Sequence, residues 1–199
     1  MSLSGHQSAR MKSADWLTPP EWIGLLGPFD LDPCCPPNMP WRTATHYLTS
    51  REQCTICGGS GQFQVADQEM GECRSCDGLS LPWRGRVWLN PPFGQEAGKW
   101  LRKLRDHGNG IALVPARTET VMFYESVWGH ASAVCFVKGR PHFYYVDGTR
   151  APFNSGAPIA LIAYGYQNSL TLAKSGLGVV TKETLALERA ASELVRGAA

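Results

Sequence analysis

The chain has 199 residues, of which 43% are hydrophobic, and it carries a formal net charge of +2 at pH 7. This length suits one compact domain with a small insert, and the mild charge neither requires nor excludes a polyanionic partner. No apolar run has the length of a membrane span, and the N-terminus lacks the regions of a signal peptide. We therefore expect a cytoplasmic protein with no membrane partner.

The first fifty residues predict a leader, a helix and a strand. Residues 1–14 are polar and without period, which predicts a disordered leader. The run Thr18-Pro19-Pro20-Glu21 has the pattern of a capping box at the start of a short helix, which would end near Gly27. The run Phe29-Asp30-Leu31-Asp32 predicts a strand end, which Pro33 terminates.

Strands and helices then alternate along the chain. The pattern predicts strands over 86–89, 111–114, 132–137, 141–146 and 158–164, and helices over 96–107 and 119–128. This alternation indicates a Rossmann-like α/β domain with a mostly parallel sheet, formed by residues 15–49 and 81–180. Because no helix separates the last two strands, we expect an antiparallel edge. Residues 181–199 predict a C-terminal helix.

Two cysteine pairs mark a segment of different composition, residues 50–80. Apolar residues are sparse there, and fifteen residues separate the two C-x-x-C pairs. This spacing indicates a tetrahedral zinc site, and because four thiolates fill it, the metal would be structural. We predict one zinc per chain, held by Cys54, Cys57, Cys73 and Cys76. Two disulfides or a redox dithiol are the alternatives.

Two roles fit this zinc-binding insert. It either grips DNA as a target-recognition element or only stabilises the fold. The segment is not basic, because its two arginines stand against five acidic residues: Arg51 and Arg74 against Glu52, Asp67, Glu69, Glu72 and Asp77. Its first half, C-x-x-C-x-G-x-G, is similar to the zinc repeats of DnaJ-type chaperones.

The run Asn90-Pro91-Pro92-Phe93 follows an apolar strand directly. Ligands of open α/β sheets bind beyond the carboxyl ends of strands, where Asn90 would lie. The Asn90 side-chain carbonyl and the proline carbonyls offer fixed acceptors that match the two N–H groups of an exocyclic –NH₂, and Phe93 offers a face for stacking a base. The run therefore predicts an amino-group site. The alternative is a rigid structural turn.

Five segments occur in an order that resembles one enzyme family. Trp16 to Pro19 comes first, then Phe29-Asp30-Leu31-Asp32, then Trp88 to Gly94, followed by Val114 to Thr120 and Gly139 to Phe143. This order is similar to the phage-type DNA N-6-adenine methyltransferases, and the resemblance covers roughly residues 15–165, with the cysteine segment as an interruption. It implies transfer of a methyl group from S-adenosylmethionine to adenine N6 in DNA by a phage- or prophage-encoded enzyme in a bacterial cell.

The resemblance also implies roles for individual residues. Asn90, Pro91 and Pro92 would form the catalytic motif that binds the target amino group, and Phe93 would stack on the base. Thr18 and Pro19 would line the cofactor pocket, with Asp30 and Asp32 near the ribose or amino-acid end of the cofactor. One departure is that no Gly-x-Gly loop follows Asp32, because Pro33-Cys34-Cys35 stands there. Capping or solvated loop carboxylates are the alternative for both aspartates.

The motif itself leaves other acceptors open. RNA adenine, cytosine N4 and protein glutamine all present an –NH₂ group, and a non-catalytic, zinc-containing DNA-binding protein is a further alternative. Arg117, which follows a predicted strand end at Pro115, and Arg140, which lies near a predicted tight turn at Gly139, are candidates for DNA contacts. The basic residues around the helix 96–107 fit either phosphate contacts or a solvated helix face. We expect a structural role for His142 and core positions for Trp16, Trp22 and Trp88.

Overall fold

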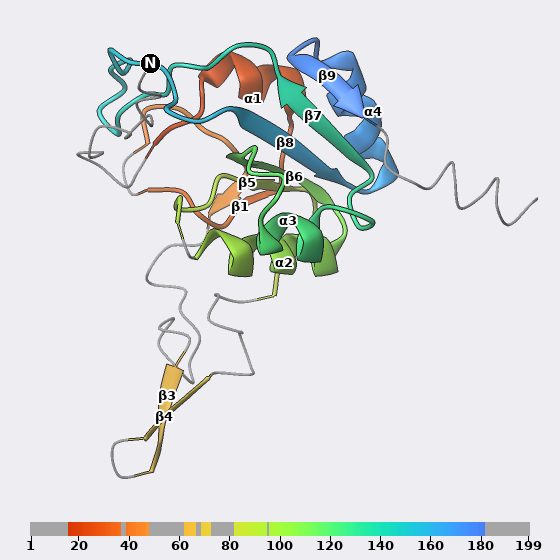
Figure 1. The fold of residues 1–199 in the computed structure, drawn as a ribbon. Coiled ribbons are helices and arrows are strands. Elements are labelled where there is room, and N and C mark those ends of the chain that lie inside the picture. Colours follow the sequence, from red (N-terminus) through yellow and green to blue (C-terminus); the bar gives the residue numbers. More distant parts are fainter. Residues whose placement is uncertain are drawn as a thin grey trace, which may run out of the picture.

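The computed structural model describes residues 16–36, 39–47, 62–66, 69–72, 82–94 and 96–181 (Figure 1). These ranges contain the helices α1 (Pro20–Leu26), α2 (Ala97–His107), α3 (Val121–Ser126) and α4 (Tyr166–Lys174). They also contain the strands β1 (Leu31–Asp32), β2 (His46–Tyr47), β3 (Gln62–Ala66), β4 (Glu69–Glu72), β5 (Val87–Leu89), β6 (Gly110–Pro115), β7 (Ala133–Val137), β8 (Ile159–Tyr164) and β9 (Gly178–Thr181). Within these ranges no helix is long and apolar enough to cross a membrane.

Seven strands form one mixed sheet in the order β2-β1-β5-β6-β8-β7-β9. Strands β2, β1, β5 and β6 pair in parallel, whereas β8 pairs antiparallel with both β6 and β7, and β9 pairs antiparallel with β7. The chain is therefore an α/β protein whose arrangement is compatible with a Rossmann-like fold. The expected mostly parallel sheet with an antiparallel edge is found only in part, because three of the six strand pairings in this sheet are antiparallel and β8 lies inside the sheet.

Helices cover both faces of this sheet (Figure 1). Alternate residues of the central strands point to opposite faces, so that Trp88 and Ile111 pack with α1, while Val87 and Ala112 pack with α2 and α3. For this reason the strands are apolar on both faces, and their continuous apolar runs allowed β5 and β6 to be predicted from the sequence. The three-layer arrangement leaves the carboxyl ends of β1, β5 and β6 together at one edge.

Several expected elements differ from the structure. Thr18 does not cap α1, because the N-cap is Pro19 and no side chain bonds there. Residues 141–146 form no strand beyond a bridge at Tyr144. The sequence did not predict α4 or β9, since Leu172 is the only buried apolar side chain of α4. Of the predicted helix over 181–199, Thr181 ends β9 and the rest lies outside the described residues, as does the predicted leader over 1–14.

Only part of the predicted insert over residues 50–80 is described. Strands β3 and β4 form a separate antiparallel two-stranded sheet, drawn apart from the main sheet in Figure 1. The register pairs Gln62 with Glu72, so the chain leaves the hairpin beside the point where it entered. The four cysteines Cys54, Cys57, Cys73 and Cys76 lie outside the described residues.

Candidate active site

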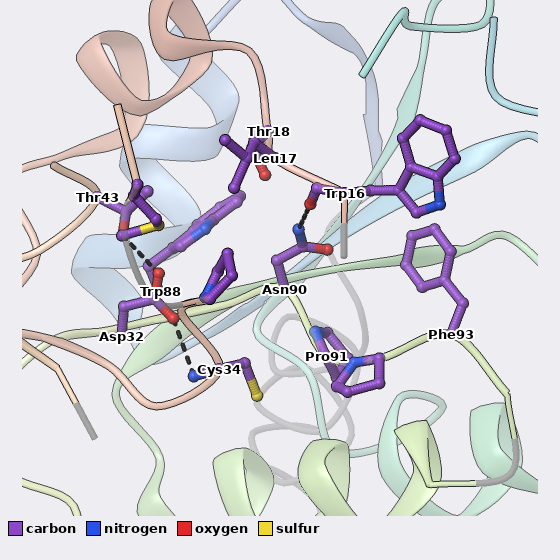
Figure 2. A pocket seen from close by; sticks show the side chains of 13 residues that line it. Trp16, Leu17, Thr18, Asp32, Cys34, Thr43, Trp88, Asn90, Pro91 and Phe93 are labelled. Carbon is purple, nitrogen blue, oxygen red and sulfur yellow. Dashed lines mark hydrogen bonds between the residues drawn. The ribbon is translucent and has the colours of Figure 1, made fainter. Parts of the chain in front are cut away.

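A pocket opens at the carboxyl edge of β1 and β5 (Figure 2). Its walls come from three separate parts of the sequence: the segment before α1, the segment after β1 and the run after β5. The lining residues are Trp16, Leu17, Thr18, Asp32, Cys34, Pro36, Met39, Thr43, Trp88, Asn90, Pro91, Pro92 and Phe93. Six of the predicted site residues are among them, so residues far apart in the sequence meet as expected.

Asn90 stands at the centre of the pocket and has a fixed orientation. Its side-chain Nδ2 donates a hydrogen bond to the main-chain carbonyl of Trp16 over 2.7 Å. This bond uses one of the two N–H groups on Nδ2 and fixes the orientation of the amide, which leaves Oδ1 as a free acceptor. Figure 2 shows Asn90 between the Asp32 carboxylate on one side and the rings of Phe93 and Trp16 on the other, with Oδ1 toward the rings.

The residues after Asn90 form a rigid wall. Pro91 is buried and Pro92 is exposed, and neither has an N–H to donate. Phe93 is half-buried and packs edge-on against Phe143 at a ring-centroid distance of 6.1 Å. Trp16 extends the same aromatic group, 6.5 Å from Phe143 and 5.2 Å from Tyr145. This side of the pocket therefore presents an apolar, aromatic surface next to the Asn90 acceptor.

Asp32 lies on the opposite side and is 3% exposed. Oδ2 accepts a hydrogen bond from the Thr43 hydroxyl over 2.5 Å, and Oδ1 accepts one from the main-chain N–H of Cys34 over 3.0 Å. Burial raises the pKa of this carboxyl to about 6, and the two hydrogen bonds act in the opposite direction. A buried, anchored carboxyl at a strand end is suited to bind hydroxyl or ammonium groups of a ligand.

Thr18 is 2% exposed, and its hydroxyl has no hydrogen-bond partner within the described structure. Buried polar groups are normally paired, and an unpaired one in a pocket wall indicates a missing partner. Pro19, the other predicted cofactor residue of this segment, is buried as the N-cap of α1 and is not part of the lining. Thr18 and Asp32 thus place an unpaired hydroxyl and a buried carboxyl in the wall on this side of the pocket.

Asp30 is a second predicted cofactor residue that is not part of the pocket lining. It is exposed to solvent. Its Oδ2 accepts a hydrogen bond from the main-chain N–H of Arg86 over 2.7 Å. The carboxylate packs so closely against Gly85 that a Cβ there would lie 2.4 Å from Oδ2. Asp30 therefore holds the turn that leads into β5.

Arg117 and Arg140 are both exposed. Arg117 follows β6, and Arg140 follows β7, which runs in the same direction as β5 and β6 because both β6 and β7 pair antiparallel with β8. Both arginines therefore lie at the sheet edge from which Asn90 projects.

Three other basic residues near β5 are engaged in the fold. Arg102 pairs with Glu125 at 3.0 Å, and Arg105 pairs with Asp106 at 2.8 Å. The Arg86 guanidinium donates to Asn168 and lies 4.3 Å from the centre of the Phe29 ring. These contacts favour the interpretation of the helix as a solvated face.

The structure also adds and reassigns residues. His142 Nδ1 lies 3.0 Å from the Ala151 carbonyl, in keeping with a structural role. Trp16, expected in the core, is half-buried in the pocket wall. Thr43 and Phe143 were not predicted, because an isolated threonine or phenylalanine carries no local signal of its partner. Within the described ranges no group of three or more His, Cys, Asp or Glu residues could hold a metal ion.

Comparisons with known proteins add no relative to this description: no protein-family model, no curated protein and no solved structure matches the chain.

Proposed function

We propose that the chain is an S-adenosylmethionine-dependent methyltransferase that modifies the exocyclic amino group of adenine in DNA. The single observation that carries this proposal is the orientation of Asn90, whose Nδ2 is bound to the Trp16 carbonyl. A ligand amino group next to Asn90 meets an acceptor, Oδ1, rather than a donor. An –NH₂ group is therefore the complementary partner of this site.

The chemistry of the target side follows from two acceptors and a ring. Asn90 Oδ1 and the Pro91 carbonyl accept hydrogen bonds from the two N–H groups of the amine, which localises the lone pair on its nitrogen. Phe93 stacks on the base and holds it in position. No general base is required before bond formation, because the proton leaves after the methyl group has been transferred. Positioning and electrostatics therefore supply most of the rate.

The opposite side of the pocket suits the methyl donor. S-adenosylmethionine, when bound, supplies a methyl group on a sulfonium, which is activated toward nucleophiles. Thr18 would pair its free hydroxyl with the cofactor, and Asp32 would bind at the ribose or amino-acid end. Pro91 and Trp88 are buried lining residues and would limit the access of water between the two sides. The segment after β1 replaces the glycine-rich loop, with the Cys34 N–H turned to Asp32 instead of to a ligand.

Adenine in DNA is the proposed acceptor on two grounds. The order of segments resembles the phage-type DNA N-6-adenine methyltransferases, and Arg117 and Arg140 lie exposed at the edge that carries Asn90. A base in a duplex must rotate out of the stack to reach such a pocket. The arginines would then hold the flanking phosphates.

The test is incubation of the wild-type protein with labelled S-adenosylmethionine and, in separate reactions, duplex DNA, structured RNA or a glutamine-containing protein. The proposal predicts label in DNA and not in RNA or protein. Calorimetry with S-adenosylmethionine alone separates the remaining alternative, since a non-catalytic DNA-binding protein would not bind it. Absence of both cofactor binding and transfer would refute the proposal.

A structural zinc in the insert is the second component of the proposal. The hairpin of β3 and β4 brings Glu72 back beside Gln62, and in the sequence Cys73 follows Glu72 directly while Cys57 precedes Gln62 by five residues. A hairpin between two C-x-x-C pairs is an arrangement common in small zinc modules. Elemental analysis should find about one zinc per chain, and chelation should unfold the insert. A metal-free, fully folded protein would refute this component.

A further inference from the structure

The connection between β7 and β8, residues 138–158, is an irregular hairpin that projects an aromatic side chain. Three main-chain hydrogen bonds join its two arms. The N–H of Tyr145 donates to the Thr149 carbonyl over 2.9 Å, and the N–H of Ala151 donates to the Phe143 carbonyl over 2.8 Å. The N–H of Ser155 donates to the Pro141 carbonyl over 2.7 Å. Between the last two of these bonds, one arm has only His142, whereas the other has three residues, of which Phe153 is the middle one. The longer arm must bulge, and Phe153 is 80% exposed.

This hairpin is mounted on the wall of the pocket. Tyr144 and Leu17 exchange two main-chain hydrogen bonds, at 2.9 and 3.0 Å, and Phe143 contacts the ring of Phe93. Phe153 is two residues from Ala151, whose N–H donates to the Phe143 carbonyl, so at most about 7 Å of chain separates the Cα atoms of Phe153 and Ala151. A solvent-exposed phenylalanine is thus carried by a hairpin whose other arm contacts the pocket residue Phe93 through Phe143.

The surroundings of Phe153 are basic. Arg140 and Arg150 belong to the same hairpin and are exposed, and neither takes part in an ion pair within the part of the chain that the structure describes. Asp147 is the one carboxylate of the hairpin, and it accepts hydrogen bonds from both the N–H and the hydroxyl of Thr149. The Arg140 guanidinium donates one hydrogen bond, to the Gly156 carbonyl over 3.1 Å, and both arginines stay exposed to solvent. An exposed ring flanked by two exposed guanidinium groups is complementary to a surface that offers both phosphates and stacked bases.

We propose that Phe153 is a stacking wedge, which enters the DNA duplex and fills the space vacated when the target base rotates into the pocket, while Arg140 and Arg150 bind the adjacent phosphates. This inference rests on the proposed function and specifies how the duplex is engaged. Apolar side chains inserted between base pairs are a general means of opening a duplex, and removal of the ring takes away the contact that compensates for lost stacking.

The experiment compares two duplexes that carry the methylated sequence, mapped first on plasmid DNA treated with the wild-type protein. In one duplex the target adenine is paired, and in the other the opposing nucleotide is abasic, so that the adenine leaves the stack easily. Phe153→Ala should slow methylation of the paired duplex about 10- to 100-fold and that of the abasic duplex less than about 3-fold. Phe153→Trp should preserve both rates. Val179→Ala, an exposed residue on the far edge strand β9, is the matched control.

Two outcomes would overturn the wedge. Phe153→Ala could methylate the paired duplex at the wild-type rate, or it could be equally slow on both duplexes, which would indicate a role other than stacking. A wild-type protein that methylates neither duplex nor plasmid DNA would instead overturn the methyltransferase proposal and the wedge with it. The two failures are distinguishable because the wedge concerns only the ratio of the two rates.

Discussion

The Asn90 side chain donates a hydrogen bond to the main-chain carbonyl of Trp16 over 2.7 Å, across 74 positions of the sequence. This bond orients the amide, and with it the acceptor on which the proposed reaction depends. It also joins the segment before α1 to the end of β5, the two walls that contribute Thr18 and Phe93 to the pocket.

The first prediction concerns Asn90 itself. Asn90→Ala removes the acceptor, and we expect the kcat/KM of methyl transfer to fall by at least about 100-fold, as is typical when one preorganised polar contact is removed from an active site. The dissociation constant of S-adenosylmethionine, measured by calorimetry, should change less than about 3-fold, because Asn90 holds the target and not the cofactor. Gln167→Ala, which removes an exposed amide side chain on α4, is the control. Full activity of Asn90→Ala would exclude the mechanism.

The second prediction is that a substitution of Thr18 weakens the binding of S-adenosylmethionine without lowering the stability of the fold. Because its hydroxyl is buried and unpaired, Thr18→Val should leave the free energy of unfolding unchanged or raise it by about 1 kcal/mol. The same change should weaken S-adenosylmethionine binding about 5- to 10-fold, since the cofactor loses its partner. Thr171→Val, whose hydroxyl bonds Gln167 on α4, should leave binding unaffected. Unchanged cofactor affinity in Thr18→Val would remove Thr18 from the site.

Asp30 should show the opposite behaviour. Asp30→Ala removes the acceptor of the Arg86 N–H and should lower the free energy of unfolding by about 1 to 2 kcal/mol in urea denaturation. Its effect on S-adenosylmethionine affinity should be less than about 2-fold, because Asp30 lies outside the pocket lining. Asp30→Asn retains an acceptor and should recover most of the stability. A large loss of affinity at unchanged stability would return Asp30 to the cofactor site.

Asp32 predicts a pH dependence of stability. Burial raises the pKa of its carboxyl from 3.8 to about 6, so the folded state holds this proton more tightly than the unfolded state does. The contribution of the protonated Asp32 carboxyl to the free energy of unfolding is fully present below about pH 4, and it is lost as the pH rises through about 6. Asp32→Asn removes this titration. The free energy of unfolding of the variant, minus that of the wild type, should therefore increase between about pH 4 and pH 7, by at most about 3 kcal/mol.

Urea denaturation of both proteins at a series of pH values measures this difference, in which the titrations common to both cancel. A difference that is constant with pH would show that the Asp32 carboxyl ionises in the folded protein as it does in the unfolded one.

Much of the fold could be predicted because the central strands are apolar on both faces. Helices on either side bury two of these strands, Val87 to Leu89 and Ile111 to Val114, and such strands have continuous apolar runs in the sequence. The helix over 97–107 was also found, since Leu101 and Leu104 have helical spacing and Gly108 ends it in a left-handed conformation. Strand order had no such local signal, which is why the internal position of β8 was not predicted.

In the candidate site too, features encoded in consecutive residues could be predicted, and contacts between distant segments could not. Asn90 to Phe93 could be predicted because chemistry and a turn are encoded in four consecutive residues. The Asp32–Thr43 and Asn90–Trp16 bonds could not, since each depends on how distant segments pack. Asp30 and Asp32 look alike in the sequence, yet one faces solvent and the other is buried. Strand alternation does not separate them, because side chains two positions apart in a strand face the same side. Asp30 precedes β1 and packs against Gly85, whereas Asp32 lies in β1 and lines the pocket, and only the packed fold shows this difference.

The most direct test of the central claim is nucleoside analysis of plasmid DNA after incubation with S-adenosylmethionine and either the wild-type protein or Asn90→Ala. The account predicts N6-methyladenine in the DNA treated with wild type and none above background in the DNA treated with the variant. Methyl groups on another base, or equal N6-methyladenine with both proteins, would contradict it.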